Sequence, residues 1–408
     1  MKPSGIEWIG DIPDDWEVRK LLSLFKEHKD RNKNLEEQNL LSLSYGKIKR
    51  KDINNNDGLL PASFETYNIV EKGDIVFRLT DLQNDKRSLR TGIVTQRGII
   101  TSAYVTIRPK IKLDSRFYHY LYHMYDICKV FYGMGDGVRQ GMGFEDLKNI
   151  PTLIPPLKTQ QKIADYLDEK CGEIDATIAK QKESIEKLKA YKQSLISETV
   201  TKGLDKSAPL KPSGIDYLGD IPSHWEIKKL KFLVSLIDNK TKDGHSISLE
   251  NIESGTGKLI ETENTYDGEG ISFKENDLLF GKLRPYLAKV YLSALKGRAL
   301  GDFYVMRANK GTNPNFLKFV LLSDWFIKIV DSSTYGTKMP RASWDFTGGM
   351  RIPLPPISEQ DCISSYLEIK CSEVDTFIIE KQNIIQKLDT YKKSLIFECV
   401  TGKRYLWV

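Results

Sequence analysis

Residues 2–21 read KPSGIEWIGDIPDDWEVRKL, and residues 211–230 read KPSGIDYLGDIPSHWEIKKL. The two stretches are identical at 13 of 20 positions, at an offset of 209. A second pair of stretches, residues 155–201 and 355–401, is identical at 22 of 47 positions, at an offset of 200. The segments between these blocks barely align. The chain is therefore an internal duplication in which a repeated frame carries two different inserts.

Both copies of the longer repeat have the heptad spacing of a coiled coil. The seam alternates steps of four and three and includes polar residues at Gln181 and Lys192, repeated as Lys381 and Lys392. Each copy follows a Pro-Pro pair, which suits a helix start and cannot lie inside a helix. We expect two helices of about 40 residues, roughly 60 Å long, that pair with each other. The apolar seam positions are Leu167, Ile174, Ile178, Ile185, Leu188, Leu195, Leu367, Val374, Ile378, Ile385, Leu388 and Leu395.

The order of the blocks predicts the topology. The first helix leads into the second KPSGI block, and by the repeat the second helix should lead into the block at residue 2, so the chain ends should be neighbours. We predict an α+β fold with two mixed α/β domains, joined by two long antiparallel coiled-coil helices in a pseudo-two-fold ring. The predicted domains are residues 1–154 and 204–354, and the predicted helical regions are residues 155–203 and 355–408.

The two inserts share a predicted skeleton. Residues 72–77 and 275–280 read as a turn that enters a strand, and residues 103–108 and 302–307 read as a second shared strand. Apolar, aromatic helices are expected over residues 116–130 and 315–330. Since the surfaces differ while the skeleton is shared, the surfaces are expected to carry the specificity.

Composition favours a cytoplasmic protein. The net charge of +6 is compatible with a polyanionic partner, but is a weak indication alone. The five cysteines form no CxxC pair, which indicates a reducing compartment rather than a disulfide framework. No signal peptide is expected, and the most apolar stretch, residues 316–330, is too short and too charged to cross a membrane.

Several motifs together resemble a known family. GDIP-x-x-WE occurs at residues 10–17 and 219–226, and proline-rich stretches at 150–156 and 352–356 precede the heptad repeats. With two variable inserts and two repeated helical regions, the chain resembles the specificity subunit of a type I restriction–modification system. The resemblance covers essentially the whole chain, and the order and duplication of the motifs are more specific than any single motif.

The resemblance implies a non-catalytic, DNA-binding subunit. Each target-recognition domain would read one half of a bipartite, asymmetric site in double-stranded DNA. The paired helices would hold two modification subunits that methylate adenine at N6, and restriction subunits would join to form the nuclease. No cofactor is then expected in this chain, since S-adenosylmethionine, ATP and Mg would bind in the partner subunits.

The family has no fixed set of base-contacting residues, so the candidates come from residue chemistry. Arginine pairs bidentately with guanine and glutamine with adenine in the major groove, whereas lysine mostly meets phosphate. Basic clusters and two glycine-containing loops, residues 133–143 and 335–344, supply such residues; the alternative for each is a solvated surface charge. The predicted DNA contacts are Lys47, Lys49, Arg50, Lys51, Arg78, Arg87, Arg90, Arg139, Gln140, Lys282, Arg284, Arg298, Lys338 and Arg341.

Catalytic and metal sites are not predicted. His119 and His123 stand four residues apart, but Tyr120 replaces the glutamate of the zincin pattern, which favours a structural helix. Neither a GxGxxG or Walker loop nor an adenine-methyltransferase motif is present; Asn313-Pro314 is not one. Two alternatives remain open: a methyltransferase or nuclease that acts alone, and a coiled-coil scaffold that binds no DNA.

Overall fold

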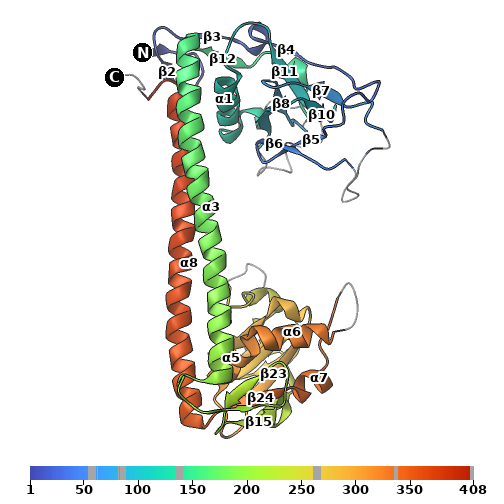
Figure 1. Cartoon of the computed structure of the whole chain (residues 1–408), viewed down its shortest axis with the longest axis vertical. Helices are drawn as coiled ribbons and strands as arrows, with labels where there is room; N and C mark the ends of the chain where they lie inside the picture. Colours follow the sequence, from blue (N-terminus) through green and yellow to red (C-terminus); the bar gives the residue numbers. More distant parts are fainter. Residues whose placement is uncertain are drawn as a thin grey trace. The chain divides into compact units, whose positions relative to one another are not determined.

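The computed structural model describes residues 1–53, 61, 63–80, 82, 89–133, 141–260, 268–334 and 339–404 (Figure 1). The chain forms two compact units. Unit 1 comprises Met1–Lys180 and Asn383–Val408, and unit 2 comprises Gln181–Gln382. Each unit contains a mixed α/β domain and a segment of each of two long helices, α3 (Leu157–Lys202) and α8 (Ile357–Val400). The predicted domain boundaries stay a prediction, because both helices pass from one unit into the other.

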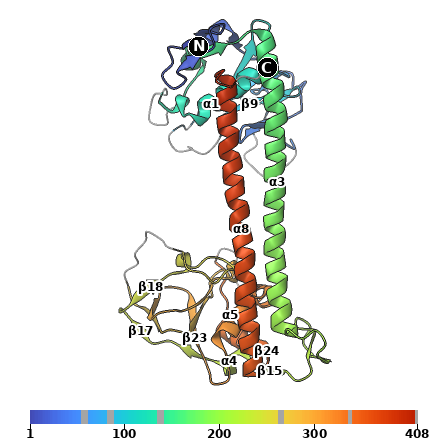
Figure 2. The same cartoon turned by 90° about the vertical axis from the view of Figure 1, so that its left-hand side faces the viewer.

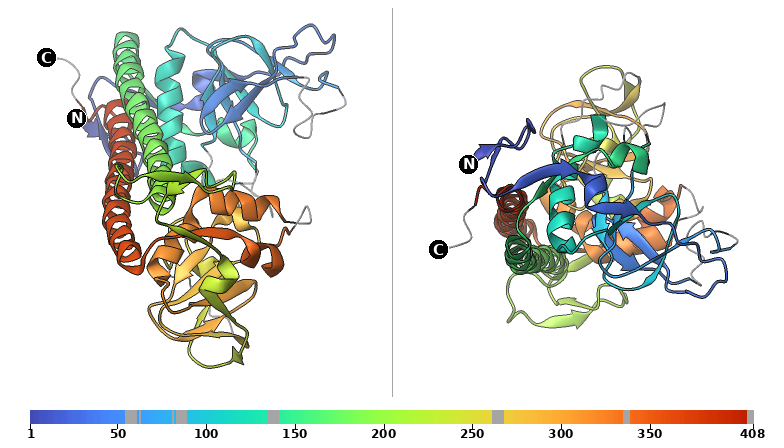
Figure 3. Two further views of the ribbon diagram at one scale, coloured as in Figure 1. Left: turned by 60° about the horizontal axis from the view of Figure 1, so that its bottom comes forward. Right: turned by 90° about the horizontal axis from the view of Figure 1, so that it is seen from above.

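Within each unit the α3 and α8 segments lie side by side (Figures 2 and 3). In unit 1, Ile163 near the start of α3 belongs to the same core as Leu395 near the end of α8. In unit 2, Ile196 near the end of α3 shares a core with Ile363 near the start of α8. The early part of one helix thus meets the late part of the other, which confirms the predicted antiparallel pairing. The apolar seam residues are all buried or half-buried.

The two helices begin in the same way. The side-chain amide nitrogen of Gln160 donates to the carbonyl of Pro155 over 2.8 Å, and Gln360 donates to Pro355 over 2.8 Å. The amide oxygen of each glutamine then accepts a backbone N–H from its α/β domain, from Asp114 in unit 1 and from Asn313 in unit 2. Each amide, hydrogen-bonded through both its nitrogen and its oxygen, therefore ties a helix start to the neighbouring domain.

The helix ends also repeat. Gly203 and Gly402 follow the two helices with φ of 73° and 71°, in the left-handed region that glycine adopts without strain. A Cβ at Gly203 would lie 3.1 Å from Trp225, and one at Gly402 would lie 3.2 Å from Trp16. In unit 1, Gly402 lines the same hollow as Met1. The end of α8 and the start of the chain are therefore neighbours, as the repeat predicted.

The two α/β domains share one sheet order. The first domain has the four-stranded antiparallel sheet β4-β11-β8-β9, and the second has β16-β23-β20-β21. A bidentate ion pair stands at matching places in both sheets, between Asp74 and Arg108 and between Asp277 and Arg307, with donor–acceptor distances of 2.7–2.8 Å. The strands are β4 (Phe25–Glu27), β8 (Ile75–Phe77), β9 (Thr91–Ile93), β11 (Val105–Pro109), β16 (Val234–Ile237), β20 (Asp277–Gly281), β21 (Val290–Leu292) and β23 (Phe303–Ala308).

Smaller sheets surround this shared core. In the first domain, hairpin β5-β6 and the pair β7-β10 lie beside the main sheet, and in the second a four-stranded sheet has the order β17-β19-β22-β18. A strand before each long helix pairs with the strand after each KPSGI block, as β12-β3 and β15-β24. The strands are β1 (Lys2–Pro3), β2 (Asp11–Ile12), β3 (Glu17–Lys20), β5 (Leu41–Ser44), β6 (Lys47–Arg50), β7 (Asn68–Val70), β10 (Gly98–Ile100), β12 (Pro151–Ile154), β13 (Leu210–Pro212), β14 (Asp220–Pro222), β15 (Glu226–Lys229), β17 (Lys240–Thr241), β18 (His245–Ile247), β19 (Gly270–Phe273), β22 (Gly297–Ala299) and β24 (Arg351–Leu354).

The helices of the α/β domains follow the prediction with one correction. Helix α1 (Ser115–Ile127) occupies the first predicted stretch, with Asp114 as its N-cap. The second stretch was predicted as one helix but forms two helices, α5 (Pro314–Leu322) and α6 (Asp324–Ser332). The backbone is extended at Ser323, between them, and the N–H of Asp324 donates to Ser197 of α3 over 3.1 Å. Contact with α3 therefore accompanies the break. Two short helices, α2 (Phe144–Leu147) and α7 (Trp344–Gly349), precede the strands that lead into α3 and α8.

None of the helices formed by the described residues has the length and apolarity that crossing a bilayer requires.

Candidate nucleic-acid interface

Three of the predicted contacts come together in the second α/β domain. Lys282 and Arg284 follow β20, and Arg341 precedes α7, about 60 residues later in the chain. The backbone joins them, since the N–H of Ala342 donates to the carbonyl of Lys282 over 2.8 Å and Leu283 bridges to Arg341. The sequence placed these residues in separate clusters, and the fold makes them one basic surface.

A single carboxylate organises this basic surface. The Arg341 guanidinium donates to Asp302 over 2.9 Å through Nη2 and 3.2 Å through Nε, and the Lys282 ammonium lies 4.0 Å from the same carboxylate. Arg341 and Arg284 are exposed. Arg341 and Lys282 beside this aspartate, together with the exposed Arg284 nearby in the chain, leave a net positive surface, which suits phosphate.

Aromatic side chains lie among these cations. The Lys282 ammonium stands 5.4 Å from the centre of the Tyr304 ring, which in turn lies 5.2 Å from the ring of Trp344. Burial, together with the nearby Asp345 and Asp302 carboxylates, raises the pKa of Tyr304 to about 12, and its hydroxyl donates to the carbonyl of Ala342 over 2.7 Å. The ring is thus held in place and supports the lysine through a cation–π contact.

Arg284 has an unusual backbone. Its φ is 50°, in the left-handed region that disfavours side chains other than glycine, asparagine and aspartate. Its N–H donates to the carbonyl of Pro340 over 2.8 Å, which holds that conformation. A strained, exposed arginine beside the loop before α7 is the kind of residue that binding sites retain.

The first α/β domain carries a different basic surface. Lys49, Arg50 and Lys51 are exposed on and just after β6. Arg50 and Lys51 line a cleft of about 820 Å³. The remaining lining residues are Gln38, Asn39, Asp52, Ile53 and Gln96. The sequence analysis did not predict the three amide side chains, those of Gln38, Asn39 and Gln96, as contacts. The one signal in the sequence was the Gln38-Asn39 pair, which ends two residues before β5 begins.

Lys47 points elsewhere than its neighbours. Its ammonium lies 3.4 Å from the carboxylate of Asp175 on α3, and the same carboxylate accepts from Lys392 of α8 over 2.7 Å. Unit 2 repeats this arrangement, because Asp375 accepts from Lys192 and from Lys258, each over 2.7 Å. Lys192 and Lys392 of the seam thus each meet an aspartate, and each aspartate also meets a lysine from its own α/β domain. This assigns Lys47 a contact within the protein.

Arg90 is a correction to the predicted contacts. The residue is completely buried, and its Nη1 donates to the carbonyls of Thr80 over 2.8 Å and Arg78 over 3.2 Å. Its Nε donates to the hydroxyl of Tyr132 over 3.1 Å. An arginine whose donors are used inside the core cannot reach DNA, so the prediction for Arg90 is wrong.

Two of the other candidates, Arg298 and Arg78, lie in the described part of the chain, and four lie outside it. Arg298 on β22 donates to the carbonyls of Lys242 and Gly244, each over 2.7 Å, and so closes a turn. Arg78 is half-buried beside Arg90. Arg87, Arg139, Gln140 and Lys338 lie outside the described residues.

His119 and His123 of α1 lie close together, with ring centres 6.0 Å apart. Burial lowers the pKa of His119 from 6.5 to about 3 and that of His123 to about 4, so both rings are neutral near pH 7. Among the residues described here, no group of three or more histidine, cysteine, aspartate or glutamate side chains could hold a metal ion.

Comparisons with known proteins agree with this architecture. Residues 13–189 match the family described as type I restriction modification DNA specificity domain. The type I restriction enzyme MjaVIII specificity subunit of Methanocaldococcus jannaschii is 24% identical over 96% of this chain and 93% of its own length. The EcoDI specificity subunit of Escherichia coli is 22% identical over 63% of each chain.

Solved structures share the fold. A chain of the structure described as "Structural basis underlying complex assembly and conformational transition of the type I R-M system" superposes with a TM-score of 0.71, at 13% identity, over 97% of this chain and 100% of that one. The HsdS subunit from Thermoanaerobacter tengcongensis has a TM-score of 0.52, at 14% identity, over 97% and 98% of the two chains. The predicted fold class and the predicted resemblance are confirmed.

Proposed function

Because this chain is a relative of the type I restriction enzyme specificity subunits, we propose that it reads a bipartite site in double-stranded DNA, one half with each α/β domain. The observation that carries the proposal is the pair of domains with one sheet order and different surfaces. The second domain offers arginines and a lysine beside tyrosine and tryptophan, and the first offers amides beside Arg50 and Lys51. Equal scaffolds with unequal surfaces suit two different half-sites.

We propose further that the chain is not itself an enzyme. Two modification subunits would methylate adenine at N6 with S-adenosylmethionine, and restriction subunits would add ATP- and Mg-dependent cleavage. A repeated frame supports two equivalent docking surfaces. Tyr191 of α3 and Tyr391 of α8 occupy the same repeat position and are 55% and 51% exposed, and exposed tyrosines are common in interfaces. Since the DNA target is cytoplasmic, so is the proposed location.

Domain exchange tests the proposal. Residues 22–154 are replaced by the first insert of a related specificity subunit with a different target, and methylated sites are mapped in cells that carry the modification subunits. One half of the recognised site should change, and the other half should stay. The matched exchange of residues 231–354 should change only the other half. A complex in which either exchange alters both halves would contradict the modular proposal, and unaltered sites would contradict DNA reading by these domains.

A further inference from the structure

The cleft beside hairpin β5-β6 in unit 1 has the chemistry of a base-reading site. Its wall carries the amides of Gln38, Asn39 and Gln96 and the cations of Arg50 and Lys51. An amide offers a donor and an acceptor side by side, which matches N7 and the N6 amine of adenine in the major groove. A volume of about 820 Å³ leaves room for the edge of a base pair to approach.

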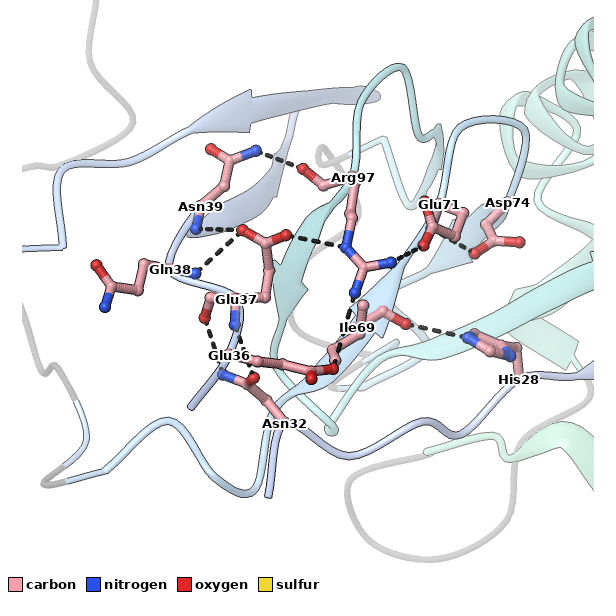
Figure 4. Close-up of polar contacts among 10 residues, drawn as sticks. All are labelled: His28, Asn32, Glu36, Glu37, Gln38, Asn39, Ile69, Glu71, Asp74 and Arg97. Atoms are coloured by element: carbon pink, nitrogen blue, oxygen red, sulfur yellow. Dashed lines mark hydrogen bonds and ion pairs between the residues drawn. The ribbon is translucent and has the colours of Figure 1, made fainter. Parts of the chain in front are cut away.

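The loop that carries Gln38 is held by its own neighbours (Figure 4). Asn32 is fully buried, and its side chain donates to the carbonyl of Glu37 over 2.9 Å and accepts the N–H of Glu37 over 3.1 Å. The Glu37 carboxylate then accepts the N–H groups of Gln38 over 3.0 Å and Asn39 over 2.9 Å. The backbone at Gln38 is therefore fixed before any ligand arrives.

Arg97 closes this network (Figure 4). Its Nε donates to Glu37 over 3.1 Å, its Nη1 bonds Glu71, and its Nη2 lies 3.8 Å from Glu36. The Asn39 amide donates back to the Arg97 carbonyl over 2.6 Å. Although Arg97 lies in a basic stretch of sequence, its guanidinium faces three carboxylates, so it orders the loop instead of meeting phosphate.

The Gln38 side chain extends away from that network (Figure 4). It is exposed, and among the described residues no hydrogen bond uses its side-chain amide. A fixed backbone with an uncommitted amide is what bidentate reading needs, because little loop ordering remains to oppose binding. The side-chain nitrogen of Asn39, by contrast, already donates to the carbonyl of Arg97.

We propose that Gln38 is a specificity-determining residue of the first domain that reads an adenine through the major groove. Arg50 and Lys51 hold the adjacent phosphates, and Arg97 is a positioning residue that acts through Glu37. This assignment rests on the proposed function, since it names a residue of the same DNA-reading surface.

The test uses the full chain assembled with its modification subunits. Binding is measured by fluorescence anisotropy on duplexes in which each base pair of the first half-site is replaced in turn. Gln38→Ala should lower discrimination by about 5- to 150-fold at one A·T pair and leave the other positions unchanged. Gln38→Glu should move the preference at that pair toward C·G, because a carboxylate accepts from the cytosine N4 amine. Lys51→Ala is the matched control and should weaken binding to all duplexes alike.

Arg97→Ala should relax the same base pair as Gln38→Ala, and Arg97→Lys should restore part of the discrimination. Equal weakening on every duplex in Arg97→Ala would overturn its positioning role. Unchanged discrimination in both Gln38 variants, with a selective wild-type complex, would overturn the assignment of Gln38 and leave the proposed function standing. A wild-type complex without sequence preference would instead refute the proposed function.

Discussion

The Lys381 ammonium donates to the side-chain oxygen of Gln181 over 3.2 Å, and the two residues occupy the same position in the two copies of the repeat. At this contact, equivalent positions of α3 and α8 therefore face each other. Two lysines at this point would face each other, whereas glutamine opposite lysine gives the ammonium an acceptor. The difference between the copies relieves a like-charge contact that perfect duplication would create.

Exchanging these two residues tests that relationship. Gln181→Lys places lysine opposite lysine and should destabilise the full chain by about 1 kcal/mol, because like charges meet at a half-buried seam. Lys381→Gln places amide opposite amide and should leave the thermal midpoint nearly unchanged. The double exchange, Gln181→Lys with Lys381→Gln, should recover the wild-type midpoint. Equal midpoints for the two single variants would remove the like-charge explanation.

The aspartates of the helix pair predict a loss of stability in acid. Burial alone would raise the pKa of Asp375, but hydrogen bonds from Lys192 and Lys258 outweigh it and hold the pKa below 3.8. A lowered folded-state pKa contributes stability above the unfolded value, which is lost as the pH falls through the folded value. Denaturant titrations between about pH 5 and pH 2 should show this loss. In Asp375→Asn the free energy of unfolding should depend less steeply on pH over the same range. An unaltered slope in that variant would contradict the assignment.

The half-buried histidines of α1 predict a second loss of stability, at higher pH. The pKa values of His119 and His123 fall from 6.5 to about 3 and about 4, so the unfolded chain takes up protons first as the pH drops. Stability should therefore be complete above pH 6.5 and fall between pH 6.5 and about pH 4, at most by about 1.4 kcal/mol per pH unit for each ring. His119→Gln should reduce the slope, and the control His245→Gln, on an exposed residue, should not. Equal slopes in the two variants would contradict neutral histidine rings in the folded state.

Substitution of Arg90 should affect the stability of the protein, whereas substitution of Lys49 should affect DNA binding. Arg90→Ala removes a buried guanidinium and leaves the carbonyls of Arg78 and Thr80 without its hydrogen bonds, so unfolding should become easier by about 2–4 kcal/mol. Lys49→Ala should leave stability unchanged, weaken binding to every duplex, and lower the salt slope of log K by about 1. Equal destabilisation by both substitutions, measured by urea unfolding, would contradict the contrast.

Arg341 should act on the second half-site only. Arg341→Ala should relax discrimination at one base pair there by about 1–3 kcal/mol, because its guanidinium is held by Asp302 and exposed to solvent. Arg341→Lys keeps the charge but cannot donate bidentately, so it should restore affinity without restoring selectivity. Methylation rates on duplexes altered in each half-site provide the measurement. A selectivity change in the first half-site would contradict the division of labour.

The frame could be read from the sequence because its signals are local or repeated. Heptad steps and Pro-Pro starts predicted α3 and α8, and the order of the blocks predicted that they are antiparallel. Matching strand patterns predicted that the two inserts share a skeleton. The break at Ser323 escaped this reasoning, since it accompanies a contact with Ser197, more than a hundred residues away.

The roles of individual charged residues were decided by tertiary structure. A basic stretch predicts ionised side chains, but not their neighbours. Arg90 is buried, Arg97 faces three glutamates, and Lys47 meets Asp175, while Gln38, which carries no charge, lines a cleft. Lys282 and Arg341 form one surface because a backbone pairing joins distant segments. The duplicated frame can be recognised in the amino-acid sequence alone, because its periodicity lies along the chain. Only the fold decided which polar groups face solvent, because burial and pairing depend on residues brought together from far apart.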